Sequence, residues 1–191
     1  MIILIYIIFS ILVFDAKSGI VDEKFLEEKV PELIEASGKG ITETVEELLE
    51  KGVDINGQNE YGNTALHATA FSGQADMVKL LCKYKADVNI KNKYGWTSLH
   101  LASRYGFKDV VEILLENNAD PDATNNSGLT SLHEAAYKGE IDVIKLLIEQ
   151  GAKLNLKNDY GETALDQAIK YQNDEVVEIL RSFGMKSGKD E

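Results

Sequence analysis

A histidine followed by a glutamate, His133-Glu134 in the stretch GLTSLHEAAY (128–137), begins like the H-E-x-x-H motif that binds zinc on a helix. That motif needs a second histidine four residues later, because both imidazoles must lie on one helical face to reach the same ion. Here that position holds Tyr137, which does not replace an imidazole as a zinc ligand. His133 therefore belongs either to a zinc site that has lost a ligand or to a pattern that has another role.

All three histidines of the chain, His67, His100 and His133, lie 33 residues apart. If units of this length stack with helices roughly 8–10 Å apart, two such imidazoles cannot share one ion, because Zn–N distances are about 2.0–2.1 Å. The spacing therefore argues against a zinc ion shared by these histidines, and we expect no metal site.

Other catalytic signatures are also incomplete. The stretch SGKG at 37–40 lacks the G-x-x-x-x-G-K-S/T spacing that cradles phosphate, and no G-x-S-x-G occurs. Cys82 is the only cysteine, which excludes an internal disulfide, and its apolar context KLLCKY predicts a buried small side chain rather than a nucleophile. We expect no cofactor and no enzymatic activity. A hydrolase with an acid pair formed across repeats is the alternative.

The histidines belong to a pattern that repeats every 33 residues. Its start reads TALH at 64–67, TSLH at 97–100, TSLH at 130–133 and TALD at 163–166. An apolar segment follows in the same register, as in DMVKLLCKYKADVN from Asp76 and DVVEILLENNADPD from Asp109. Weaker copies at both ends bring the total to about five. A single unit cannot bury its apolar faces alone, but a stack of units can.

These units resemble the ankyrin repeat, whose period is 33 residues and whose signature is T-P-L-H-x-A, with alanine or serine here in place of the proline. The resemblance implies an all-α ankyrin-repeat solenoid of about five helix-turn-helix repeats joined by β-hairpin loops. It also implies that each imidazole hydrogen-bonds backbone or a threonine hydroxyl between neighbouring repeats. The expected ankyrin domain covers 19–191, with repeats at approximately 26–58, 59–91, 92–124, 125–157 and 158–190.

Within each unit, the residue types predict where helices begin and end. Thr130 is expected to cap a short helix, and a second helix follows Gly139. In the first unit, Pro31 is expected as the first helical residue. A structural role is expected for the glycines two residues before each threonine, which are Gly62, Gly95, Gly128 and Gly161. A left-handed cap of the second helix is expected at Gly52, Lys85, Asn118, Gly151 and Gly184, at some cost in stability where the residue is lysine.

The charge of the chain limits its partners. With 32 acidic and 20 basic residues the net charge is −12, and such a chain is a poor general binder of nucleic acid, because phosphate binding relies on Lys and Arg. Residues 20–60 hold 12 acids and 4 bases, against 19 and 15 in 61–191. We interpret the acidic N-terminal part as a solvated face. A binding site for a basic partner is the alternative.

The first fourteen residues, MIILIYIIFSILVF, differ in character from the rest. A helix of this length spans about 21 Å, less than the roughly 30 Å of a bilayer core. The segment 1–18 fits a secretory signal peptide, with Ala16 and Ser18 placed for cleavage after Ser18. Because no Lys or Arg precedes the apolar run, an uncleaved anchor and a wrongly assigned start are alternatives. The expected location is secreted, periplasmic or membrane-tethered, and otherwise cytoplasmic.

The expected function is that of a non-enzymatic protein–protein interaction module or scaffold, acting as a monomer. A membrane-anchored structural adaptor is the alternative. A rigid, concave surface needs little ordering when a partner docks. We expect binding on the hairpin tips and the exposed side of the first helices, where Trp, Tyr and Arg, the usual interface anchors, gather. The candidates are Tyr61, Tyr94, Trp96, Arg104, Tyr105, Leu129, Tyr137, Lys138 and Tyr171. For the hairpin tyrosines, packing of one hairpin against the next is the alternative.

Overall fold

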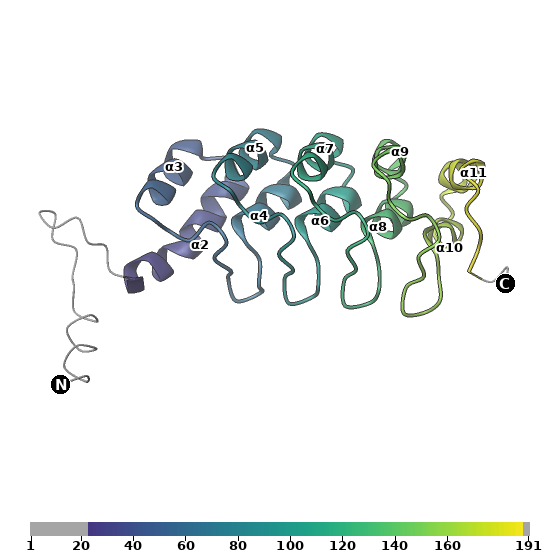
Figure 1. Cartoon of the computed structure of the whole chain (residues 1–191), viewed down its shortest axis with the longest axis horizontal. Coiled ribbons are helices and arrows are strands. Elements are labelled where there is room, and N and C mark those ends of the chain that lie inside the picture. Colours follow the sequence, from purple (N-terminus) through teal and green to yellow (C-terminus); the bar gives the residue numbers. More distant parts are fainter. Residues whose placement is uncertain (1–22, 189–191) are drawn as a thin grey trace, which may run out of the picture.

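The computed structural model of the chain describes residues 23–188 (Figure 1). The expected leader at 1–18 and its cleavage site lie outside this range. Within it, none of the helices has the length and apolar character needed to cross a membrane.

The described residues form ten helices in two parallel rows, shown in Figure 1, with long loops projecting beside the first row. The first row contains α2 (Glu23–Lys39), α4 (Ala65–Ser72), α6 (Ser98–Arg104), α8 (Ser131–Lys138) and α10 (Ala164–Lys170). The second row contains α3 (Thr42–Glu50), α5 (Ala75–Lys83), α7 (Lys108–Glu116), α9 (Ile141–Glu149) and α11 (Asp174–Ser182). From α4 onwards, both rows repeat every 33 residues, as the sequence predicts.

The short first-row helices α4, α6, α8 and α10 each begin after a threonine, which acts as the N-cap and stabilises the first turn. Thr64 has extended backbone angles, and its hydroxyl accepts a hydrogen bond from the His67 amide in the first turn. The His67 side chain accepts in return from the Thr64 amide, which gives a reciprocal capping box. The same exchange occurs between Thr97 and His100 and again in α8.

The core lies between the two rows and runs continuously along the stack. First helices contribute one fully buried leucine each, while the second helices contribute branched residues such as Val111 and Ile144. Small residues at 102, 135 and 168 let neighbouring first helices approach closely. Each buried Leu or Ile contributes roughly 1.5–3 kcal/mol. In the five first-row helices these leucines are Leu33, Leu66, Leu99, Leu132 and Leu165.

The caps of the second helices have the left-handed backbone that the sequence predicts. Lys85 has φ 68° and Asn118 has φ 66°, while Gly52, Gly151 and Gly184 are also positive. A left-handed lysine is disfavoured by its Cβ, so this position carries strain that a glycine would not.

The connecting loops are hairpin turns without strands, which corrects the expected β-hairpins for residues 23–188. In one loop, the Asn92 amide donates to the Trp96 carbonyl at 2.9 Å, and the Asn92 side chain accepts from the amides of Tyr94 and Trp96. Adjacent loops share one such backbone bond, as from the Lys93 amide to the Tyr61 carbonyl at 3.1 Å. One bond per loop pair is too few to form a strand ladder.

The start of the first repeat also differs from expectation. Helix α2 begins at Glu23, eight residues before Pro31, so that the proline lies inside the helix rather than at its first position. The preceding residues, EKFLEEKV, favour helix and contain no turn signal. Pro31 is exposed, so the amide hydrogen bond that it cannot make is lost on the solvent side.

Candidate partner-binding surface

The three histidines link one repeat to the next. Nε2 of His67 lies 2.9 Å from the carbonyl oxygen of Trp96, and His100 makes the equivalent contact with Leu129 at 3.0 Å. His133 contacts Glu162 in the same way at 3.1 Å. Because each Nδ1 accepts from a threonine amide, Nε2 must carry the proton and donate. Both nitrogens of every imidazole are therefore occupied.

Burial keeps these imidazoles neutral. It lowers the pKa of His100 to about 4, with the hydrogen bond to the Leu129 carbonyl acting in the opposite direction. Burial likewise lowers the pKa of His67 and of His133. No group of three or more His, Cys, Asp or Glu side chains within 23–188 is arranged to hold a metal ion. His133 instead uses both ring nitrogens for hydrogen bonds within and between repeats.

In the last repeat an aspartate takes the place of the histidine. Asp166 accepts from the Thr163 amide at 2.8 Å and from the Gly188 amide at 2.7 Å, and Ser187 donates to its other oxygen. Although burial acts to raise its pKa, these hydrogen bonds hold the pKa of Asp166 below the usual value. Residues 187 and 188 are therefore tied to the first turn of α10 through Asp166.

The remaining reactive side chain of interest is Cys82. It is half-buried against the core, and burial raises the pKa of its thiol. A raised pKa favours the unreactive thiol over the thiolate.

The predicted tyrosines of the hairpin tips point into solvent. Tyr61 is 52% exposed and Tyr94 is 61% exposed, and Tyr160 at the equivalent position reaches 78%. No ring contact joins these three within the part of the chain that the structure describes. Their rings are therefore accessible, rather than used to pack one hairpin against the next.

Other predicted residues meet in one cluster on the first helices. The Arg104 guanidinium lies over the Tyr137 ring at 4.6 Å and over the Trp96 ring at 5.5 Å. The Tyr137 ring meets that of Tyr171 edge-on, with centroids 4.3 Å apart, and Lys138 lies 5.0 Å above it. Three repeats thus contribute to one set of touching side chains.

The cluster contains an acid that the sequence analysis did not single out. Glu134 is only 2% exposed, and its Oε2 lies 2.5 Å from Nη1 of Arg104. Burial raises the pKa of Glu134, and Arg104 opposes that effect. The equivalent positions in neighbouring repeats hold Ala68, Leu101 and Gln167, so the charge at this single position was the available signal.

Two hollows flank Arg104. One, of about 320 Å³, is lined by Tyr94, Trp96, Leu101 and Tyr105. The other, of about 220 Å³, lies one repeat further on and is lined by Leu129, Glu134, Tyr137, Gln167 and Tyr171, among others. Arg104 borders both. We call this region, comprising residues 91–104 and 124–138, the central strip.

A separate, larger cavity of about 840 Å³ lies at the N-terminal end, between α2 and the loop at 52–60. Its lining includes the apolar residues Leu26 and Val30 and several acidic residues. These acidic residues are Glu23, Glu27, Asp54 and Glu60.

Comparison with known proteins agrees with this architecture. A family model described as ankyrin repeats (three copies) matches residues 33–125 and again 117–189. A segment of 48 residues is 46% identical to inversin from Danio rerio, covering 24% of this chain but only 5% of inversin. Ankyrin repeats are generally protein–protein interaction modules rather than enzymes. Since the two family matches together span most of the chain, and the helices repeat in the same register, the chain belongs to the ankyrin-repeat family.

Proposed function

We propose that this protein is a non-enzymatic binding module whose protein partner docks on the hairpin tips and the exposed side of the first helices. The observation that carries the proposal is the cluster of Trp96, Arg104 and Tyr137, which lies between two hollows on one accessible side of the stack. Aromatic and arginine side chains dominate the energetics of most protein interfaces.

The cluster is also held in place before any partner arrives. Arg104 is fixed by two rings and by Glu134, and the Tyr105 ring packs edge-on against Phe71 with centroids 5.0 Å apart. Side chains that are already ordered lose less conformational entropy on binding, which favours affinity. We infer that a monomer suffices for this role, and light scattering after size exclusion tests that part of the proposal.

Affinity capture with the mature chain, followed by mass spectrometry, identifies the partner, and a double variant then tests the surface. We expect Trp96→Ala with Tyr105→Ala to weaken binding by roughly 2 kcal/mol or more, because both rings line one hollow. Isothermal titration against the captured partner measures this, with circular dichroism as the folding check.

Phe183→Ala is a matched control, since Phe183 is an exposed aromatic residue at the end of the second-row helix α11. Its affinity should equal that of the unmodified chain. If the double variant binds normally, whereas changes at Lys79 or Glu112 on the second helices abolish binding, the partner uses the other row.

We further propose that the apolar segment at the N-terminus exports the module or tethers it to a membrane. The support is the run MIILIYIIFSILVF followed by small residues. Sequencing the N-terminus of the native protein decides between the two: a start at or near Gly19 indicates export, and a retained Met1 indicates an anchored adaptor. Unprocessed chain recovered from the cytosol would contradict both.

The absence of catalysis is part of the proposal and has its own test. The purified chain should not hydrolyse a panel of ester, phosphate and peptide substrates. Hydrolysis that disappears on mutation of an acid pair would replace the binding function by an enzymatic one.

A further inference from the structure

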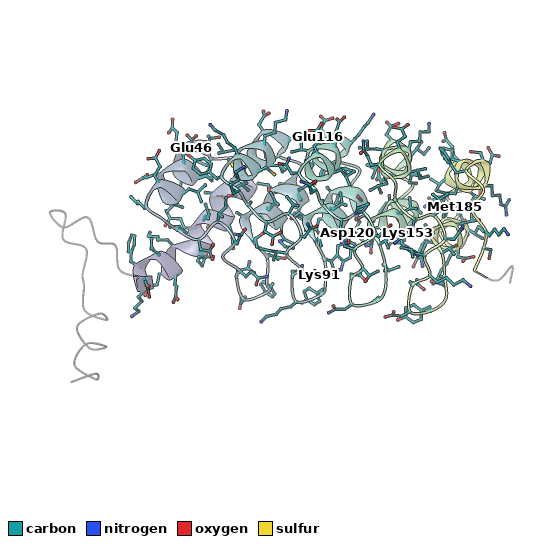
Figure 2. The ribbon with its side chains drawn as sticks, viewed as in Figure 1. Glu46, Lys91, Glu116, Asp120, Lys153 and Met185 are labelled. Carbon is teal, nitrogen blue, oxygen red and sulfur yellow. The ribbon has the colours of Figure 1, made fainter. Side chains whose placement is uncertain are left out.

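Charge is divided between the two sides of the stack. The five second-row helices carry 13 acidic and 5 basic residues. Figure 2 shows Glu46 and Glu116 along that edge and Lys91 on the hairpin side. The central strip differs, since its basic residues are Lys91, Lys93, Arg104 and Lys138 and its single acid is Glu134. A chain of net charge −12 therefore presents a locally basic surface where its aromatic residues cluster.

The acid of the central strip does not offset this charge for a partner. Glu134 is buried, and its carboxylate faces Arg104 rather than solvent. Within residues 23–188, the Arg104 side chain makes only the hydrogen bond from Nη1 to Glu134. A guanidinium has five N–H donors in a planar fork. With its side chain 27% exposed, Arg104 keeps donors for a second carboxylate.

The hollows on both sides of Arg104 offer aromatic and aliphatic walls beside polar side chains, which are those of Asn92 in the first and of Gln167 in the second. Tyr94, Trp96 and Leu101 line the first, and Leu129, Tyr137 and Tyr171 line the second. The two hollows lie on adjacent repeats, whose packed helices are roughly 8–10 Å apart. An extended chain covers that distance in about three residues, at about 3.3 Å per residue.

We propose that the central strip binds an extended acidic segment of a partner protein, with an Asp or Glu carboxylate on Arg104 and apolar side chains in the two hollows. This inference rests on the proposed function and adds the chemistry of the partner. A basic segment is disfavoured, because Lys91, Lys93 and Lys138 would repel it. The carboxylate of Glu134 is already paired with Arg104, and that of Glu162, beside the second hollow, is paired with Lys170.

A library of random 12-residue peptides displayed against the immobilised full chain tests the proposal directly. We expect enrichment of peptides with a net negative charge, in which an Asp or Glu is flanked by aliphatic or aromatic residues. One enriched peptide is then synthesised, together with its Asn/Gln counterpart, and both are titrated. The amide version should bind at least about tenfold more weakly, which corresponds to about 1.4 kcal/mol.

Variants of the protein separate partner binding from folding. The pair Arg104→Gln with Glu134→Gln removes both charges and leaves no buried carboxylate alone; it should weaken the acidic peptide about tenfold. Glu134→Gln by itself keeps Arg104 in place, because the amide oxygen can still accept its hydrogen bond, and removes the competing charge, so it should strengthen binding. Arg181→Gln is the matched control, because Arg181 is the only other arginine and lies on α11. It should leave the affinity unchanged within about twofold.

Several results would overturn the proposal. Enrichment of basic peptides, or equal binding of the acidic peptide and its amide version, would remove the assigned charge preference while leaving a binding module intact. Weaker peptide binding by Glu134→Gln would mean that Arg104 only forms the ion pair with Glu134 and does not bind a carboxylate of the peptide. If no peptide is enriched but affinity capture still returns a partner, the acidic segment is wrong and the module stands. If both fail, the proposed function fails too.

Discussion

His100 makes the stability of the stack depend on pH. Its side chain is fully buried, and its pKa of about 4 lies well below the ordinary histidine value of 6.5 that applies in the unfolded chain. Between these values the unfolded chain binds a proton that the folded chain does not. The stabilisation is therefore complete above about pH 6.5 and is lost as the pH falls toward 4.

We expect the free energy of unfolding to fall by about 1.4 kcal/mol per pH unit from His100 alone within that window. His67 and His133 should add to the loss, because their pKa values are lowered in the same direction. Urea denaturation at pH 7.0 and 5.5 measures the slope. His100→Gln should reduce the slope whatever its effect at pH 7, and an unchanged slope would contradict the assignment.

Lys85 is the second residue for which a single change is informative. With φ 68°, it should be replaced favourably by glycine, and we expect Lys85→Gly to stabilise the protein by about 0.4–1 kcal/mol. Denaturant midpoints of the two proteins provide the measurement. Asn118→Gly is the comparison, with a smaller gain because asparagine tolerates this backbone better. A lower midpoint for Lys85→Gly would show that its side chain stabilises the cap.

Single-residue roles were predictable where the residue recurs with the repeat, and less so where it occurs once. The capping histidines recur at a fixed position, so their hydrogen bonds could be anticipated. The Arg104–Glu134 pair occurs at one interface only and joins residues 30 positions apart. The charge at position 134 was a signal in the sequence, but nothing there indicated that its partner would be Arg104.

Helix α2 is longer at its N-terminus than the 33-residue repeat predicts. Counting back 33 residues from Ala65 gives Glu32, but α2 begins at Glu23. The extra turns carry Leu26 and Val30, which form the wall of the N-terminal cavity. No preceding repeat covers them within the part of the chain that the structure describes. Repeat spacing alone could not predict this extension, because it depends on the local helix propensity of EKFLEEKV.

We expect Pro31→Ala to stabilise the protein by about 1–3 kcal/mol. The substitution restores an amide that can donate to the Glu27 carbonyl, and it removes the steric conflict of a proline ring inside a helix. The shift in the urea midpoint is the readout. Glu28→Ala, at an exposed position of the same helix, should change stability by less than about 0.5 kcal/mol. Destabilisation by Pro31→Ala would instead point to contacts of the ring with the cavity.

In the loops, the resemblance to the ankyrin repeat predicts the turns but not whether strands form. Their turns follow from the N-x-x-G spacing, since the asparagine side chain binds the amides two and four residues later. Gly95 is needed because a Cβ there would lie 2.6 Å from the Asn126 amide nitrogen of the next loop. Whether such loops also form strands depends on how many backbone bonds neighbouring loops share, which residue types do not specify.

At the scale of the whole molecule, one side of the stack is strongly acidic and the other carries the central strip. This division should orient an acidic partner before contact, because the acidic second helices repel it while the basic residues of the central strip attract it. It could not be predicted from the net charge, since it requires knowing which residues of each repeat share a side.

The repeated hydrogen bonds between units have a consequence for the length of the chain. The bonds from His67, His100 and His133 all reach 29 residues ahead, so removing 33 residues rejoins equivalent partners. We expect a chain lacking 131–163 to fold, with the urea m-value reduced by about a fifth because one of five units no longer unfolds. An equally long deletion of 98–130 should be about 3 kcal/mol less stable, since it retains Glu134 but discards Arg104. Equal stabilities of the two deletion variants would contradict this prediction. A less stable 98–130 deletion would mean that a unit of this chain can be lost or duplicated only where doing so does not separate a buried ion pair between repeats.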